Sequence, residues 1–300
     1  MDVSVIILTH NTRELTCDCV RAALSDAATS GLDAEVIVVD NASTDGTAQA
    51  IRDAFAGVRV IEAGENLGFA RGNNLGLAAA RGRYRFLLNS DAFVQPGALR
   101  SLATFMDAHP DAGACGPMLL NEDGSLQPSG RPLPTVWSVF VDMTKLYRLA
   151  RRNVFEERGR DYARVARVGE ISGAALMLRR EAYEATGGFD PAFFAYYEDI
   201  DLCKRIGEAG FAIYYVPDAK VMHLWKRTSR SLSEASYCAG VDSLRYYFRK
   251  HHGRVAEAAV QLMLAGRESS LMLASAVRGR HDRAALHWRM LARALEKCIF

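Results

Sequence analysis

Four short apolar runs alternate with helix-like stretches over the first 90 residues, and this alternation constrains the fold more than any other feature of the chain. The runs are Val3–Leu8, Glu35–Asp40, Val58–Ile61 and Tyr84–Asn89. Apolar runs of this length are typical of strands buried on both faces, and the first run is also rich in β-branched residues. Strands separated by helices form parallel sheets. We therefore expect an α/β fold with a mostly parallel sheet flanked by helices.

Polar clusters follow three of these runs. They are Thr9–Asn11, Asp40–Asp45 and Asn89–Asp91, and Thr47 is predicted to cap the helix after the second cluster. In parallel α/β sheets, ligands bind outside the carboxyl ends of the strands. Because all three clusters occupy that position, the sequence predicts one polar site at this edge of the sheet.

The C-terminal quarter differs from the rest of the chain in charge. Residues 226–300 contain 14 Lys and Arg against six Asp and Glu, a net charge of +8, whereas residues 1–225 carry −6. Helical periodicity from about Ser231 onward predicts amphipathic helices. We therefore divide the chain into a body, 1–225, and a basic helical C-terminal region, 226–300. The alternatives for this region are contact with an anionic membrane or ligand, pairing of two protomers, and a solvated helical face.

Composition narrows the class of protein. Hydrophobic residues make up 49% and charged residues 24%, which excludes wholesale disorder and collagen-like repeats. The six cysteines form no CxxC pair, which argues against zinc-ribbon and thioredoxin-like sites and suits a reducing compartment. Neither a signal-peptide pattern nor an apolar run of about 18 residues occurs. We expect a cytoplasmic protein, soluble or peripheral on the inner face of the cell membrane.

Asn89-Ser90-Asp91 stands directly after a predicted strand. A carboxylate there can ligate Mg²⁺ or Mn²⁺, which prefer oxygen ligands and bridge phosphates. The alternative is a simple turn, which all three residue types favour. His223 lies among apolar residues after the predicted strand Ala212–Val216, and on its own it is expected to be a core histidine.

A second acidic cluster, Glu198, Asp199 and Asp201, follows the aromatic run Phe193–Tyr197. Close like charges and apolar surroundings raise the pKa of a carboxyl group, which suits a general base. The alternative is a set of acids that complement the amino end of a helix. Both interpretations hold together if Asp199 is catalytic and Asp201 structural.

Gly68, Gly72 and Gly76 recur every four residues around the predicted helix 69–81, which also carries Arg71. This spacing places them on one face, where a ligand or another backbone can approach closely. Tight packing of the helix on the sheet explains the glycines equally well. The spacing is neither a GxGxxG dinucleotide fingerprint nor a phosphate-binding P-loop.

Taken together, five segments resemble the family 2 glycosyltransferases, which have the GT-A fold, and within them the bacterial rhamnosyltransferases. In that family's order they are Val5–Asn11, Val38–Thr47, Asn66–Asn74, Phe86–Asp91, and Gly187–Asp190 with Tyr197–Arg205. The resemblance covers roughly residues 3–225. It implies a GT-A domain, a Rossmann-like and mostly parallel sheet flanked by helices, and the helical periodicity after Ser231 adds a C-terminal helical extension.

The resemblance also implies a nucleotide pocket. Thr9, Asn11, Asp40 and Arg71 match positions that line this pocket in the family. Asp40 is the residue expected to accept a hydrogen bond from the base. These four side chains, with Asn89 and Asp91, form the implied binding site for the nucleotide sugar.

For catalysis and metal binding, the resemblance singles out five residues. Asn89-Ser-Asp91 matches the DxD motif of the family, with Asn in place of the first Asp, so Asp91 is the implied contact to Mg²⁺ or Mn²⁺. His223 matches a late histidine that completes the metal site. Asp199 matches the catalytic base of the xED motif, with Glu198 supporting it.

The implied reaction is an inverting transfer of a sugar, L-rhamnose from dTDP-L-rhamnose, to a hydroxyl of a cell-surface glycan or lipid-linked acceptor. The alternatives are another UDP- or GDP-sugar donor and a sugar nucleotidyltransferase. A nucleotidyltransferase would need a glycine-rich basic loop after the first strand, and Thr9–Arg13 contains no glycine. A nucleic-acid partner is not expected, because the body is acidic and no RNP, KH or zinc-finger pattern occurs.

Overall fold

The computed structural model describes residues 1–146, 161–224 and 234–296. These residues belong to two compact units, each described here by itself. Unit one comprises Met1–Pro132, Asp161–Phe194 and Glu198–Arg230, and unit two comprises Leu133–Arg160, Ala195–Tyr197 and Ser231–Phe300. The described residues 133–146 therefore group with the C-terminal helices and not with the body that precedes them.

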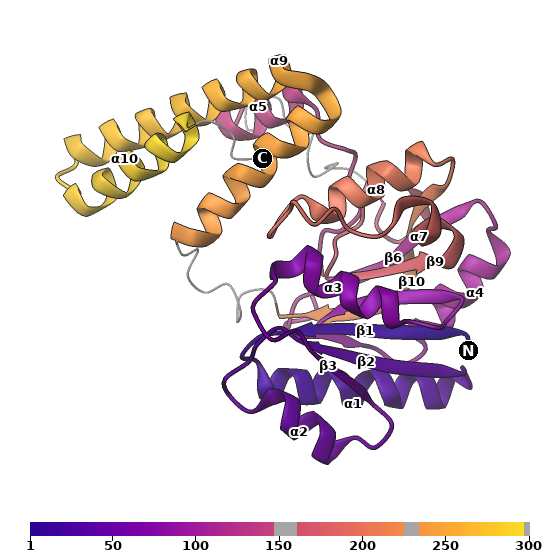
Figure 1. Ribbon diagram of the computed structural model, residues 1–300. Helices are drawn as coiled ribbons and strands as arrows, with labels where there is room; N and C mark the ends of the chain where they lie inside the picture. Colours follow the sequence, from indigo (N-terminus) through magenta and orange to yellow (C-terminus); the bar gives the residue numbers. More distant parts are fainter. Residues whose placement is uncertain (147–160, 225–233, 297–300) are drawn as a thin grey trace. The chain divides into compact units, whose positions relative to one another are not determined.

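The described part of unit one contains a ten-stranded sheet (Figure 1). Its strands are β1 (Val3–Thr9), β2 (Ala34–Asp40), β3 (Arg59–Glu62), β4 (Tyr84–Asn89), β5 (Ala92–Val94), β6 (Ala112–Leu120), β7 (Leu126–Gln127), β8 (Ala166–Arg167), β9 (Ala175–Arg179) and β10 (Ala212–His223). Their order is β3-β2-β1-β4-β9-β6-β10-β5, with β7 on β6 and β8 on β10. The first four strands are parallel, and β9 is antiparallel to both of its neighbours. The expected mostly parallel α/β sheet is confirmed.

Helices cover both faces of this sheet (Figure 1). They are α1 (Arg13–Ser30), α2 (Thr47–Ala54), α3 (Gly68–Ala79), α4 (Ala98–Ala108), α7 (Arg180–Thr186) and α8 (Glu198–Glu208). Ile7 belongs to the hydrophobic core that α1 and α4 share with the sheet, whereas its neighbour Ile6 lies against α3. Because successive residues of a strand point to opposite faces, α1 and α3 cover opposite faces of β1.

The glycines of α3 serve its packing on the sheet. A Cβ atom on Gly72 would lie 2.6 Å from a methyl of Leu8, and one on Gly76 would lie 2.3 Å from a methyl of Ile6. Both contacts are too short for any side chain larger than hydrogen. Gly68, at φ +76°, begins the helix beside Phe194. Of the two explanations for the glycine spacing, tight helix–sheet packing is the one confirmed.

Two local expectations were wrong. The sequence predicted that the last strand ends at Val216, but β10 continues to His223 across a register shift between Val216 and Lys220, where Pro217 interrupts the apolar pattern. Thr47 was predicted to cap a helix, but it is the first residue of α2. Its backbone N–H instead donates to Asp45 Oδ1 at 3.1 Å. The N-cap residue is Gly46, and Asp45 satisfies the first backbone N–H of the helix.

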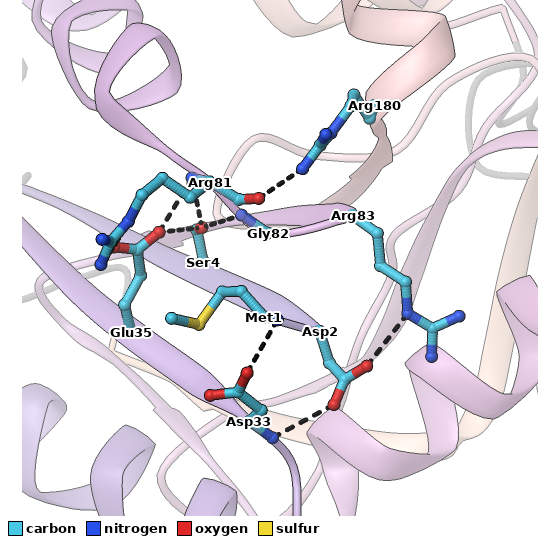
Figure 2. Close-up of polar contacts among 9 residues, drawn as sticks. All are labelled: Met1, Asp2, Ser4, Asp33, Glu35, Arg81, Gly82, Arg83 and Arg180. Atoms are coloured by element: carbon cyan, nitrogen blue, oxygen red, sulfur yellow. Dashed lines mark hydrogen bonds and ion pairs between the residues drawn. The ribbon is translucent and has the colours of Figure 1, made fainter.

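A polar network joins the amino ends of the central strands (Figure 2). The hydroxyl of Ser4 donates to Glu35 at 2.6 Å and accepts from the backbone N–H of Gly82 at 2.8 Å. Arg81 donates to both carboxylate oxygens of Glu35, at 2.8 Å from its backbone and 2.9 Å from its guanidinium. Arg83 pairs with Asp2 at 3.1 Å. These bonds fasten the turn that precedes β4 to the starts of β1 and β2.

Unit two is helical in its described part. It contains α5 (Val136–Thr144), α9 (Glu234–Val277) and α10 (His281–Leu295). At Gly253 the backbone leaves helical geometry, with φ 82° and ψ 176°, so α9 is two helices joined at this residue. The buried carboxylate of Glu268 accepts from Tyr237 and His287, each at 2.8 Å, and this links α9 to α10. The expected C-terminal helices are confirmed.

Candidate active site

The register of the sheet brings the three predicted polar clusters to one edge. Thr9 pairs with Asp40 across β1 and β2, and Leu8 pairs with Asn89 across β1 and β4. The carboxyl ends of the three strands therefore lie side by side. The expectation that Thr9, Asp40 and Asn89 lie together at the carboxyl edge of the sheet is confirmed.

The loops after β1 and β2 are held together by hydrogen bonds from Asn11. Asn11 has φ +55°, and its backbone N–H donates to Ser43 Oγ at 2.9 Å. Its side-chain oxygen accepts from the N–H of Thr44 at 2.7 Å. A pocket of about 600 Å³ opens beside this contact and is lined by His10, Asn11, Thr12, Arg13, Glu14, Leu15 and Asp45. Asn11 therefore shapes a pocket of the size that binds small molecules.

Asp40 and its neighbour Asn41 are both buried at the end of β2. Asp40 accepts from the N–H of Ser43 at 3.1 Å, which leaves its second carboxylate oxygen for other donors. Asn41 donates to Asn66 at 2.9 Å and accepts from the N–H of Leu67 at 2.8 Å. Asn41 thereby fixes the start of α3.

Arg71 lies one turn into α3 with an exposed side chain. Within the described residues, no ion pair or hydrogen bond engages its guanidinium. An unengaged guanidinium is well suited to bind an anionic ligand such as a phosphate.

Asp91 and His223 face one another at the ends of β4 and β10. Asp91 Oδ1 lies 3.4 Å from His223 Nε2, and both side chains are buried. The other ring nitrogen, Nδ1, is 2.7 Å from Gln127 Oε1, so Nδ1 carries the hydrogen and donates. In the neutral ring, the lone pair of Nε2 then points toward Asp91.

This arrangement fits a divalent cation. A carboxylate oxygen and an imidazole nitrogen are metal ligands, and a hydrogen bond to the second ring nitrogen is the usual way in which a ligating histidine is oriented. Among the described residues, no group of three or more His, Cys, Asp or Glu forms a closed metal site. The side chains would therefore supply a partial coordination sphere, which suits a cation that also binds phosphate oxygens.

Asp199 lies in the first turn of α8 and remains partly accessible. Its Oδ2 accepts from the N–H of Gly173 and its Oδ1 accepts from the N–H of Ile200, both at 2.9 Å. The next residue of the same loop, Ala174, accepts from the N–H of Asn89 at 2.9 Å. The dipeptide Gly173-Ala174 therefore connects the acidic residue of α8 directly to the Asn89–Asp91 motif.

Burial raises the pKa values of the two neighbouring carboxyl groups, Glu198 and Asp199. Burial, and after it the charge of Asp199, raise the pKa of Glu198 well above its ordinary value. Glu198 Oε2 has no hydrogen-bond partner among the described residues. Burial also raises the pKa of Asp199, and its bonds from Gly173 and Ile200 oppose this rise. Because Asp199 receives N–H donors on both oxygens and Glu198 Oε2 receives none, the hydrogen bonds favour a negative charge on Asp199 over one on Glu198.

Asp201 has a different environment from the two acids before it. It is fully buried and pairs with Arg205 Nε at 2.7 Å. The guanidinium of Arg205 also donates to the backbone carbonyls of Thr186 and Gly188, at 2.8 and 2.7 Å. Asp201 thus anchors α8 to the turn after α7, which agrees with its expected structural role.

The sequence interpretation missed a third carboxyl group, Glu170. Burial, and after it the charge of Asp199, raise the pKa of Glu170 to about 8. Arg131 exchanges two backbone hydrogen bonds with Glu170, and its Nε lies 3.6 Å from Glu170 Oε1. Gln127 was also missed. All three residues fall in stretches without a clear helix or strand period, so only their residue type could have drawn attention to them.

Comparisons with known proteins identify the family of the chain. The family described as glycosyl transferase family 2 matches residues 4–187, and the one described as N-terminal domain of galactosyltransferase matches residues 160–227. An N-acetylglucosaminyl-diphospho-decaprenol L-rhamnosyltransferase of Mycobacterium tuberculosis is 34% identical over 232 residues, 71% of this chain and 73% of that protein. The rhamnosyltransferase WbbL of Escherichia coli is 24% identical over 208 residues, 65% of this chain and 75% of that protein.

Solved structures show the same fold. A mannosyltransferase from Pyrobaculum calidifontis in complex with GDP-Man and Mn²⁺ has a TM-score of 0.59 at 21% identity, covering 98% of this chain and 81% of that one. GalNAc-T7 with UDP, GalNAc and Mn²⁺ has a TM-score of 0.59 at 16% identity, covering 81% and 47%. The expected GT-A fold and the resemblance to rhamnosyltransferases are confirmed. The chain is a member of glycosyl transferase family 2.

Proposed function

We propose that this glycosyltransferase moves L-rhamnose from dTDP-L-rhamnose to a hydroxyl of a lipid-linked acceptor, with inversion at the anomeric carbon. The observation that carries the choice of sugar and acceptor is the 34% identity, over 232 residues, to an N-acetylglucosaminyl-diphospho-decaprenol L-rhamnosyltransferase. The alignment covers 71% of this chain and 73% of that protein. The same acceptor chemistry, an amino sugar on a polyprenyl diphosphate, is therefore our first candidate.

Asp199 is the proposed general base. Its two N–H donors hold the carboxylate in place, and it stays partly accessible to a ligand. It would take the proton of the acceptor hydroxyl while the oxygen bonds to the anomeric carbon and the bond to the diphosphate breaks. Burial raises the pKa of Glu198, which opposes a second negative charge beside the base. Base assistance of this kind typically contributes about 10²–10⁴-fold in rate.

Asp91 and His223 are the proposed ligands of Mg²⁺ or Mn²⁺, with Gln127 holding the histidine ring. A bound cation would neutralise the charge that develops on the departing diphosphate. By its resemblance to the DxD motif of the family, Asn89 takes the place of the first aspartate, and its amide oxygen can still contact a cation or a phosphate-bound water. Both Mg²⁺ and Mn²⁺ are proposed as candidates for the bound cation.

Thr9, Asn11, Asp40 and Arg71 are the proposed nucleotide contacts. Asp40 has one carboxylate oxygen left for the imino N–H of thymine or uracil. Arg71 has an exposed guanidinium that can bind a phosphate. The hydrogen bonds of Asn11 hold the loops after β1 and β2 together.

Transfer to a defined acceptor tests this function. The full-length protein is incubated with Mg²⁺ or Mn²⁺, dTDP-L-rhamnose and an N-acetylglucosaminyl-diphospho-polyprenol, and the product is analysed by mass spectrometry and NMR. We expect the gain of one deoxyhexose with inverted anomeric configuration. Transfer from a UDP- or GDP-sugar but not from dTDP-L-rhamnose would show that the donor is wrong. Pyrophosphate release from a nucleoside triphosphate and a sugar phosphate would instead identify a nucleotidyltransferase.

The remaining proposals concern location and partners. An enzyme that uses a soluble nucleotide sugar and a lipid-linked acceptor would act from the cytoplasm at the inner face of the membrane. The basic C-terminal region is proposed either to contact that membrane or to pair two protomers. Fractionation of the native protein distinguishes a membrane-associated pool from a soluble one.

A further inference from the structure

Large apolar side chains are exposed along one face of the second half of α9. After the break at Gly253, Val255, Leu262, Leu273 and Val277 are 85%, 70%, 61% and 88% exposed. At about 100° per residue, these four positions fall within an arc of roughly 60° on the helix. We call them the α9 stripe. An aligned apolar face without a protein partner is uncommon on a water-exposed helix.

Negative charge is absent from the exposed surface of this helical segment. Between Arg254 and Val277 the sequence contains two acids, Glu257 and Glu268, and both are buried. Glu257 lies 3.5 Å from Arg245, and Glu268 accepts from His287 at 2.8 Å. The acids are therefore used inside unit two, and the exposed face of the segment presents apolar, small and cationic side chains.

Exposed arginines stand at both ends of the α9 stripe. Arg254 precedes Val255, and Arg278 and Arg280 follow Val277. Among the described residues, none of the three is engaged in an ion pair. Long cationic side chains beside an apolar face can reach past it to phosphate groups while their stems stay in the apolar layer.

We propose that the α9 stripe binds flat on an anionic lipid bilayer, with its apolar side chains in the acyl region and the flanking arginines at the lipid phosphates. This orientation is typical of amphipathic helices that lie in the membrane interface. No helix among the described residues is long and apolar enough to span a bilayer. The inference deepens the proposed transfer to a lipid-linked acceptor and rests on it for its purpose.

A second copy of the chain fits this face less well. In a two-fold contact each stripe would meet an identical stripe. Antiparallel helices would place Arg254 against Arg278, and parallel helices would place each arginine against itself. The segment offers no exposed carboxylate to compensate. An anionic surface supplies the missing negative charge along the whole stripe.

The structure also qualifies the net charge of +8 that the sequence gives for residues 226–300. Several basic residues of the C-terminal region are engaged inside unit two, since Arg267 pairs with Glu268, and Arg293 pairs with Asp242 at 2.5 Å. Net charge therefore overstates the cationic surface. Burial of the apolar stripe in lipid is the larger contribution, and the flanking arginines select anionic headgroups.

Vesicle co-sedimentation of the full-length protein tests this surface without donor or acceptor. The vesicles contain equal parts phosphatidylglycerol and phosphatidylcholine, or phosphatidylcholine alone. The double variant Leu262→Asp/Leu273→Asp is expected to reduce the partition coefficient by about 100-fold or more. Arg278→Gln is expected to reduce it about fivefold, and only on the anionic vesicles. Val165→Asp, at an exposed apolar residue of unit one, is the matched control and should bind as the wild type does.

Two results would overturn the proposal. One is equal sedimentation of the wild type and the double variant. The other is a wild-type dimer that does not bind vesicles and becomes monomeric in the double variant, since the stripe is then an interface between copies. Failure of the proposed function is distinguishable, because it leaves vesicle binding intact while no rhamnose is transferred. If both proposals hold, the double variant retains transfer to a short-chain, water-soluble acceptor.

Discussion

Two glutamates near opposite edges of the same sheet have pKa values that are shifted in opposite directions. Glu35 lies at the amino edge with a side chain 9% exposed, and Glu198 lies beside the carboxyl edge with the whole residue 6% exposed. Burial would raise the pKa of Glu35, but hydrogen bonds from Ser4 and Arg81 lower it below its ordinary value. Burial raises the pKa of Glu198 well above that value, and no donor reaches its Oε2.

This difference suggests that polar groups at the amino edge of the sheet serve stability, whereas those at the carboxyl edge serve the proposed reaction. At the amino edge, every carboxylate of the network in Figure 2 meets a cation or an N–H group, so the network stabilises the fold. At the carboxyl edge, Glu170, Glu198 and Asp199 are gathered with raised pKa values and few donors. Such an arrangement costs stability, and proteins tolerate that cost mainly where a reaction requires it. The comparison predicts that substitutions at the two edges have separable effects.

The largest expected effect is that of Asp199→Asn. The amide keeps the size of the side chain but cannot take the proton of the acceptor, so kcat should fall by about 10²–10⁴-fold. Affinity for dTDP should stay unchanged, because the nucleotide contacts lie on other loops. Steady-state transfer assays and calorimetric titration with dTDP check the two parts.

Glu35→Gln is the matched control at the amino edge. It alters a carboxyl group of similar burial and should leave kcat as in the wild type while lowering the melting temperature. A large loss of kcat in Glu35→Gln, or full activity in Asp199→Asn, would remove the proposed separation between the edges.

The next effect concerns the cation. Asp91→Ala removes a proposed ligand, and Gln127→Ala leaves both ligands but frees the ring of His223 to rotate. We expect Gln127→Ala to weaken Mn²⁺ affinity in the presence of dTDP by about 10–100-fold, and Asp91→Ala to weaken it further. Calorimetric titration of Mn²⁺ gives both values. Unchanged Mn²⁺ binding in Asp91→Ala would exclude this residue as a ligand.

The location of the strand ends was easier to predict from the sequence than the burial and the contacts of individual side chains. The strands that end at Thr9, Asp40 and Asn89 follow from short apolar runs, and the register of a parallel sheet then brings their ends together. Glu170 and Arg131 could not be predicted in this way, because their isolated backbone pairing joins segments 39 residues apart without a repeating pattern. Likewise, the sequence shows how many acidic residues the C-terminal region contains, but only the structure shows that Glu257 and Glu268 are buried.

The pH dependence of stability should have opposite signs at the two edges. Burial and the charge of Asp199 raise the pKa of Glu170 to about 8. From about pH 4.5 to 8 the unfolded chain releases this proton while the folded protein keeps it, so Glu170 lowers stability as pH rises through that window. Glu170→Gln removes this contribution. Its melting temperature relative to the wild type should therefore increase from pH 5 to pH 8.

Glu35→Gln should show the reverse trend. The lowered pKa of Glu35 gives a stabilisation that is present above its ordinary pKa and is lost as the pH falls below it. The variant should therefore be most destabilised near neutral pH and approach the wild type in acid. Melting curves of Glu170→Gln from pH 5 to pH 8, and of Glu35→Gln from neutral pH down to about pH 3, give the two slopes. Slopes of the same sign would contradict the assignment of the two edges.

The smallest effect isolates one hydroxyl of the amino edge. Ser4 is fully buried, and in Ser4→Ala the N–H of Gly82 and one oxygen of Glu35 lose a partner. An unsatisfied buried group costs about 1–3 kcal/mol, so we expect a loss of about 2 kcal/mol in unfolding free energy with unchanged kcat. Arg21→Ala is the control, because the Arg21–Asp18 pair is exposed on both sides and its loss should be negligible. A change of kcat in Ser4→Ala at a temperature where the variant is folded would show that the two edges are coupled through β1, since this strand carries Ser4 at one end and Thr9 at the other.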